Sequence, residues 1–126
     1  MTTVGERLPE LTVEVTPTFV VSAALATRDF QDVHHDRDAA IARGSEDIFV
    51  NILTDTGLVQ RYVTDWAGPS ARVKNIAIRL GVPAYAYDTL RFSGEVTAVS
   101  GADVTVAVTA RGQLGEHILG TVEVTR

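Results

Sequence analysis

Five side chains that can move protons or bind metals lie within one short segment, Arg28-Asp29-Phe30-Gln31-Asp32-Val33-His34-His35-Asp36. The segment falls between two predicted helices, and loops at helix ends commonly carry function. Within it, Asp29 and His34 are five residues apart, so a tight loop can turn both toward one water molecule. An imidazole, with an unperturbed pKa of about 6.5, exchanges protons near neutral pH. The pair is therefore a candidate acid–base dyad.

Other interpretations of this segment remain open. Asp32, His34, His35 and Asp36 are all metal-ligand types, but adjacent histidines rarely face one ion and no H-x-x-x-H spacing is present. We therefore predict no metal. We expect Asp36 to cap the helix that follows it, and Asp32 and His35 to be solvated.

The sequence lacks the residues and motifs that several other classes of reaction and binding need. The chain has no cysteine, which excludes disulfides, thiolate metal sites and cysteine nucleophiles. It has no G-x-S-x-G elbow, no G-x-G-x-x-G and no P-loop, so neither serine hydrolysis nor a nucleotide cofactor is indicated. Sixteen acidic residues against eleven basic ones give a net charge of −5, which argues against nucleic-acid binding. His117, beside Glu116 at a predicted turn, is expected at the surface or at a sheet edge.

The length of 126 residues, 45% of them hydrophobic, predicts one globular domain over residues 1–126. No apolar run approaches the roughly 20 residues that a membrane span needs. The first residues combine neither a basic start nor an apolar run. We therefore expect a cytoplasmic protein that does not enter a membrane.

The elements that must position the dyad begin with three helices. Ser22 is expected to cap a short helix over 23–26, and Asp36 one that Gly44 ends. The longest helical pattern runs from Asn51, a plausible cap, to Trp66. Gly57 within it should cost about 1 kcal/mol relative to alanine, so we expect it to pack closely against a neighbour.

The rest of the chain predicts strands. Apolar and polar residues alternate before Pro17 and again after Pro69, as in half-buried strands. The expected strands are 11–16, 73–80, 89–100, 104–109 and 118–125. A sheet with one apolar face must cover it, and only the long helix is large enough. The predicted class is α+β, with an antiparallel sheet wrapped around one helix.

The segment from Ala26 to Asp36, followed by Ala40, resembles the signature S-G-D-x-N-P-L-H of the MaoC-like (R)-specific enoyl-CoA hydratases. Asp29 and His34 match its two catalytic positions, and Ala40 matches the small residue that follows. The stretch 47–53 falls where this family begins its central helix, and 83–90 resembles its later proline and G-D-x-L pattern. The resemblance covers most of the chain, from about residue 20 to the end.

The resemblance implies a hot-dog fold and hydration of an enoyl-CoA double bond by water that Asp29 and His34 activate. It implies that the backbone N–H of Asn51 holds the thioester carbonyl, and that coenzyme A is part of the substrate, with no separate cofactor. The chain departs from the signature at Arg28, which replaces a glycine, at Gln31-Asp32, and at Val50-Asn51, where the family has His-Gly. We also expect burial to raise the pKa of Asp29 and so strengthen it as a base.

These departures resemble one branch of the family, the small subunits of heteromeric hydratases that act on steroid side chains in cholesterol-degrading bacteria. The resemblance implies a larger partner with a second MaoC-like domain, in a heterotetramer of two small and two large chains. Gly57 is a candidate for the acyl pocket. Arg72 and Lys74 are candidates for contacts to coenzyme A phosphates, although a solvated strand face explains them as well.

Two alternatives differ from this prediction. A hot-dog thioesterase usually carries a carboxylate on the central helix, where Asp55 is the early candidate. A structural subunit would only complete a partner's site, but such a chain would need neither Asp29 nor His34.

Overall fold

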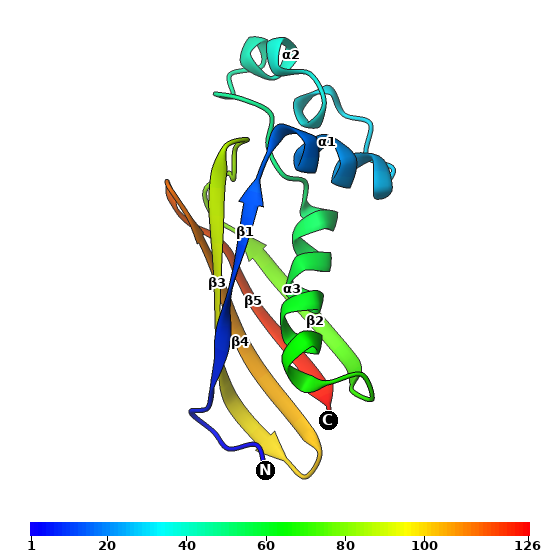
Figure 1. The fold of residues 1–126 in the computed structure, drawn as a ribbon, viewed down its shortest axis with the longest axis vertical. Helices are drawn as coiled ribbons and strands as arrows, with labels where there is room; N and C mark the ends of the chain where they lie inside the picture. Colours follow the sequence, from blue (N-terminus) through cyan, green and yellow to red (C-terminus); the bar gives the residue numbers. More distant parts are fainter.

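The computed structural model describes all 126 residues, and one five-stranded antiparallel sheet curls around the helix α3 (Figure 1). In chain order the elements are β1 (Arg7–Val15), α1 (Pro17–Ala26), a 3-10 turn (Asp32–His34), α2 (Arg37–Ala42), α3 (Ile52–Ala67), β2 (Arg72–Leu80), β3 (Asp88–Ser100), β4 (Asp103–Gly112) and β5 (Gly115–Thr125). The strand order β1-β3-β4-β5-β2 leaves β1 and β2 as the two edges. This is the predicted hot-dog arrangement.

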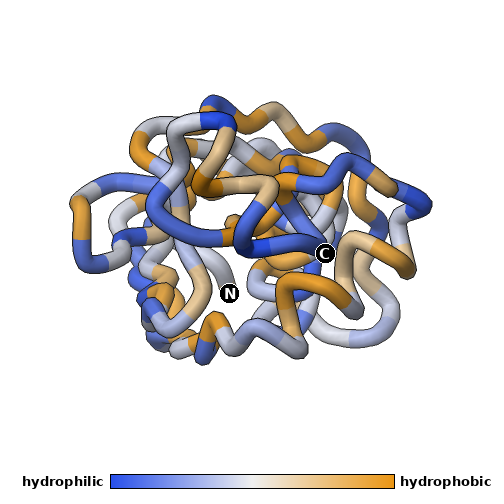
Figure 2. The backbone as a smooth tube through the Cα atoms, turned by 90° about the horizontal axis from the view of Figure 1, so that it is seen from above, coloured by the Kyte–Doolittle hydropathy of each residue, from blue (hydrophilic) through white to orange (hydrophobic).

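The core lies between the sheet and α3. Alternate residues of β3, β4 and β5 point toward the helix, which is why these strands show period-two patterns in the sequence. Figure 2 shows hydrophobic and hydrophilic residues interspersed along the backbone. Fully buried members of this core are Phe92, Val96, Val106, Val108, Val122 and Val124 from the sheet and Val59 and Val63 from α3.

Local signals in the sequence set both ends of α3. The Asn51 side chain accepts a hydrogen bond from Thr54 N at 3.2 Å, as a helix cap does. Gly68, with a φ of 100°, ends the helix. The predicted close packing of Gly57 is wrong, because an added Cβ would meet nothing within 4 Å. Gly57 lies on the face of α3 that turns away from the sheet.

The short helices lie over the N-terminal end of α3 (Figure 1). The prediction that Ser22 begins the first of them is wrong. Thr16 Oγ1 accepts from Phe19 N at 3.0 Å and Pro17 occupies the first helical position, so α1 starts six residues earlier. Asp36 caps α2 as predicted, through Ala39 N at 3.2 Å. None of the helices has the length and apolar character required to cross a membrane.

Candidate active site

The end of α1 places Asp29. The N–H of Asp29 donates to Ala24 O at 2.9 Å and that of Arg28 to Leu25 O at 3.1 Å, which is the paired pattern of a Schellman motif. Such a motif needs a left-handed residue at its turn, and Arg28 adopts it with a φ of 55°. The arginine therefore takes the conformation for which glycine is better suited. Asp29 leaves the helix end in a fixed direction.

The 3-10 turn presents His34. Its Nδ1 lies 2.7 Å from Phe49 O, and because a carbonyl oxygen only accepts, Nδ1 is the donor. The Phe49 ring meets the imidazole edge-on at 4.8 Å between centroids. These contacts hold a residue that is 5% exposed. They leave Nε2 as the nitrogen that faces Asp29.

The dyad is close but not in tight contact. Asp29 Oδ2 and His34 Nε2 are 3.4 Å apart. One water molecule that donates to the ionised Asp29 carboxylate and hydrogen-bonds to His34 Nε2 suits this spacing. The Asp29 side chain is 21% exposed, against 7% for His34. The site is therefore accessible from the Asp29 side.

Asn51 joins Asp29 to the start of α3. Its Nδ2 donates to Asp29 Oδ2 at 3.1 Å and to Thr27 Oγ1 at 2.9 Å. Burial raises the pKa of Asp29, but the hydrogen bonds from Asn51 and Gln31 N and the charges of His34 and His35 outweigh it, so the pKa is lowered. The expected upward shift is wrong, because the carboxylate is well supplied with donors and is only partly buried.

The backbone N–H of Asn51 donates to no acceptor within the chain. It lies just before the first turn of α3, where free N–H groups and the positive end of the helix dipole favour negative charge. Asn51 itself is 4% exposed. The arrangement can stabilise an oxyanion next to the dyad.

The other histidine of the loop has a structural contact. His35 Nε2 lies 2.6 Å from Asp29 O, so it donates to that carbonyl. The expectation that His35 is simply solvated is wrong, since it is half-buried and braces the backbone of Asp29. Asp32 is paired with Arg43 at 2.9 Å on the surface.

The structure does not bring the remaining candidates to the dyad within this chain. Arg72 and Lys74 lie at the start of β2, near the C-terminal end of α3 (Figure 1), while the dyad is at the N-terminal end of a helix about 24 Å long. Lys74 is exposed and pairs with Asp103 Oδ2 at 3.2 Å. Gly57 lies between these two ends of the molecule.

Sequence reasoning missed a second carboxylate–histidine pair. Asp55 and His117 are 0% and 2% exposed, so the prediction of a surface or edge position for His117 is wrong. The β4–β5 register shifts between Ala110 and Arg111, which pair with Ile118 and Glu116. This irregularity turns both His117 and its neighbour Ile118 inward, against the strict alternation that the sequence suggested. Only the polar Asp55 on the buried face of α3 signalled a partner.

The position of Asp55 also bears on the thioesterase alternative. A catalytic carboxylate must reach the substrate, whereas Asp55 Oδ2 is bound to His117 Nε2 at 2.8 Å inside the core. The residue that the thioesterase alternative needs is therefore closed off.

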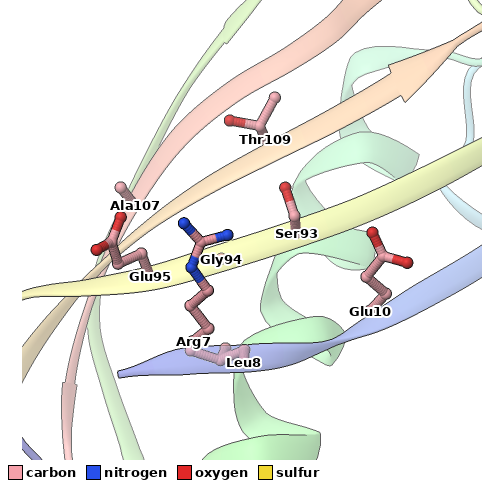
Figure 3. A pocket seen from close by; sticks show the side chains of 8 residues that line it. All are labelled: Arg7, Leu8, Glu10, Ser93, Gly94, Glu95, Ala107 and Thr109. Atoms are coloured by element: carbon pink, nitrogen blue, oxygen red, sulfur yellow. The ribbon is translucent and has the colours of Figure 1, made fainter. Parts of the chain in front are cut away.

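A separate groove of about 260 Å³ lies on the outer face of the sheet (Figure 3). It is formed by β1, β3 and β4 and lined by Arg7, Leu8, Glu10, Ser93, Gly94, Glu95, Ala107 and Thr109. Leu8 belongs to the core and Gly94 faces Tyr62 of α3. None of the lining residues belongs to the loop that carries Asp29 and His34, so the groove is not part of the dyad site.

Similar proteins agree with this geometry. No model of a known protein family matches the sequence. The chain is 71% identical, over 98% of its length and 95% of the relative's, to the 3-oxo-4,17-pregnadiene-20-carboxyl-CoA hydratase beta subunit of Mycobacterium tuberculosis H37Rv. A chain in the crystal structure of the ChsH1-ChsH2 complex from M. tuberculosis superposes with a TM-score of 0.98, at 70% identity over 99% of this chain and 98% of that one.

The fold extends to more distant proteins. The (R)-hydratase from A. caviae involved in PHA biosynthesis superposes with a TM-score of 0.90, at 20% identity over 98% of this chain and 96% of that one. This likeness shows the shared hot-dog fold. Because the chain is 71% identical to the beta subunit over nearly the full length of both chains, it belongs to the MaoC-like enoyl-CoA hydratases, in the branch of their small beta subunits.

Proposed function

We propose that this chain is the catalytic small subunit of a heteromeric hydratase that adds water across the conjugated double bond of a steroid side-chain enoyl-CoA. The observation that carries the proposal is the 3.4 Å spacing of Asp29 Oδ2 and His34 Nε2 beside the free N–H of Asn51. The substrate class follows from the relative's name, a pregnadiene-carboxyl-CoA hydratase.

In the proposed reaction Asp29 takes a proton from the bound water while the water oxygen adds to the β-carbon. Negative charge moves to the thioester oxygen, and the N–H of Asn51 stabilises it. His34, in its protonated form, delivers a proton from Nε2 to the α-carbon. Asp29 then returns its proton to Nε2 across the short gap, which restores both groups. No separate cofactor takes part, because coenzyme A is carried by the substrate.

The larger subunit is proposed to cover the open face of α3. Ile52 and Leu53 are 51% and 54% exposed there, Gly57 leaves space beside them, and the neighbouring edge strand β2 has one unpaired side. A second hot-dog domain fits such a face, in line with the complex formed by the relative. We propose two small and two large chains per assembly.

The acyl group would then lie along α3 between the subunits, with Gly57 giving room for the steroid rings. Arg72 and Lys74 are proposed to meet phosphates of coenzyme A bound mainly by the neighbouring subunit, because they lie far from the dyad of their own chain. The location is proposed to be the cytoplasm, where coenzyme A thioesters are made and used.

The test follows loss of the ultraviolet absorbance of the conjugated thioester, for a steroid enoyl-CoA and the chain co-expressed with its larger partner. Asp29→Asn and His34→Ala should each lower kcat by at least about a hundredfold, the scale of lost acid–base groups. Asp32→Asn, in the same loop but paired only with Arg43, is the matched control and should stay active. Turnover that survives both dyad variants refutes the assignment, and release of free thiol would indicate a thioesterase.

A further inference from the structure

The core beneath the first turns of α3 holds a carboxylate–histidine pair that the hydration chemistry does not use. Asp55 Oδ2 and His117 Nε2 are 2.8 Å apart, and both side chains are fully buried. The second carboxylate oxygen, Oδ1, has no hydrogen-bond partner. A buried pair of this kind is commonly no more stabilising than apolar residues of the same volume. Its presence therefore calls for a role beyond stability.

Donor and acceptor roles show that the pair holds a proton. His117 Nδ1 lies 2.7 Å from Val82 O, which only accepts, so Nδ1 donates. Nε2 then faces Asp55 Oδ2, and that contact needs a proton on one of the two atoms. Burial raises the pKa of Asp55, and although burial lowers that of His117, the bond and charge of Asp55 raise it by more. Both shifts keep the proton in place.

The pair fixes the loop 81–87 between β2 and β3. Val82 O accepts from His117, and Val82 N donates to Glu116 O at 2.9 Å. Gly81 N donates to His117 O at 2.9 Å. A Cβ on Gly81 would clash with Glu116 O, so only glycine allows the loop to lie this close to β5.

The loop in turn holds the backbone that serves the dyad. Val50 N donates to Ala84 O at 3.1 Å, and Phe49 forms an isolated antiparallel bridge with Tyr85. Phe49 O is the acceptor that orients His34. A shift of the loop therefore moves the carbonyl that sets the direction of the imidazole.

The first turn of α3 holds the backbone at Asn51, which follows Phe49 and Val50 in the chain. Asp55 N donates to Asn51 O at 3.2 Å, and the Asn51 side chain contacts Asp29. The Asp55 side chain thus ties the helix turn that carries Asn51 to β5 and to the loop. The loop 81–87 and the first turns of α3, which both support the dyad, are therefore joined by the buried Asp55–His117 contact.

We propose that Asp55 and His117 are positioning residues for hydration: their proton-sharing contact clamps the first turns of α3 to the loop 81–87 and so fixes Phe49 O and Asn51 around the dyad. This inference rests on the proposed function, because it assigns the pair a role in that reaction.

The experiment measures kcat and KM for hydration of a steroid enoyl-CoA by the complex with the larger subunit. The double variant Asp55→Ala/His117→Phe removes both polar groups and nearly conserves their summed volume, so the core stays filled. Asp55→Asn is the conservative variant, since its amide N–H can still donate to Nε2. Asp29→Asn reports on the reaction itself.

We expect the double variant to assemble and its kcat to fall by about ten- to a hundredfold at unchanged KM, as for a misplaced catalytic group. Asp55→Asn should recover most of that loss. A wild-type kcat in the double variant, at unchanged yield and Tm of the complex, overturns the proposal.

If the double variant does not assemble, Gly81→Ala decides the question, because it displaces the loop from Glu116 and leaves the pair intact. A reduced kcat at unchanged KM supports the clamp, and a wild-type kcat overturns it. A wild-type complex without hydration, or an active Asp29→Asn complex, refutes the proposed function and with it the role of the pair. These two results differ from a loss of kcat that occurs only in Asp55→Ala/His117→Phe and Gly81→Ala.

Discussion

Asn51 performs two tasks that can be separated by mutation. Its Oδ1 caps α3 by accepting from Thr54 N, and its Nδ2 donates to Asp29 Oδ2 and Thr27 Oγ1. Serine caps a helix about as well as asparagine but is too short to reach Asp29. Asn51→Ser therefore keeps the cap and removes the two Nδ2 hydrogen bonds, to Asp29 and Thr27, whereas Asn51→Ala removes the cap as well.

The magnitudes follow from these contacts. Loss of the cap costs about 1 kcal/mol, and each lost side-chain hydrogen bond about 1 kcal/mol net. We expect Asn51→Ala to lose about 2–3 kcal/mol, or roughly 10 °C in Tm for a domain of this size, and Asn51→Ser to lose about 1 kcal/mol less than that. The difference between the two variants isolates the cap.

The catalytic effect has a definite sign. The Asn51 amide favours the ionised form of Asp29 and is the main group that lowers its pKa, so both variants raise that pKa toward its ordinary value. The base is then protonated at higher pH, and the acid limb of the kcat/KM profile moves upward. The assay is thioester absorbance between about pH 4 and 8, with thermal unfolding of the same complexes at matched concentration. An unmoved acid limb in Asn51→Ser would show that this hydrogen bond does not tune the base.

Three further changes test single features. Arg28→Gly should stabilise the chain by about 0.5–1 kcal/mol, since it relieves a left-handed non-glycine residue at some cost in unfolded-chain entropy; denaturant unfolding at a lower midpoint would contradict this. Gly57→Trp should reduce turnover of a steroid enoyl-CoA but not of a short-chain enoyl-CoA, and equal effects on both would remove Gly57 from the acyl pocket. Asp36→Ala should cost about 1 kcal/mol through the lost cap of α2, read as a lower Tm, while an unchanged Tm would show that the cap contributes nothing.

The elements that were predictable depend on neighbours in the sequence. Asn51 and Gly68 bound α3 because capping and left-handed turns are local events, and the alternating valines of β4 predicted a strand with one buried face. The family resemblance, carried by Asp29, His34 and Ala40, predicted the hot-dog fold and a place among the small subunits of MaoC-like hydratases, and the fold and the family are confirmed. The catalytic roles stay predictions.

The features that could not be predicted depend on residues far apart in the chain. His117 turns inward because of a register shift against β4, which no pattern within β5 reveals. The lowered pKa of Asp29 depends on an amide 22 positions away. Ser22 was a local error of a different kind, because Thr16 followed by proline at the first helical position is the stronger start signal.

The open edge of β2 has a consequence for how the subunit must be made in the cell. Val73, Ile76 and Ile78 on this strand are only partly covered by the core, and an unprotected strand edge beside apolar surface is a template for aggregation. Newly made chains without a partner would accumulate with this edge exposed. Synthesis together with the proposed larger subunit would keep the lifetime of the exposed edge short, and expression of this chain by itself would give lower yields than co-expression.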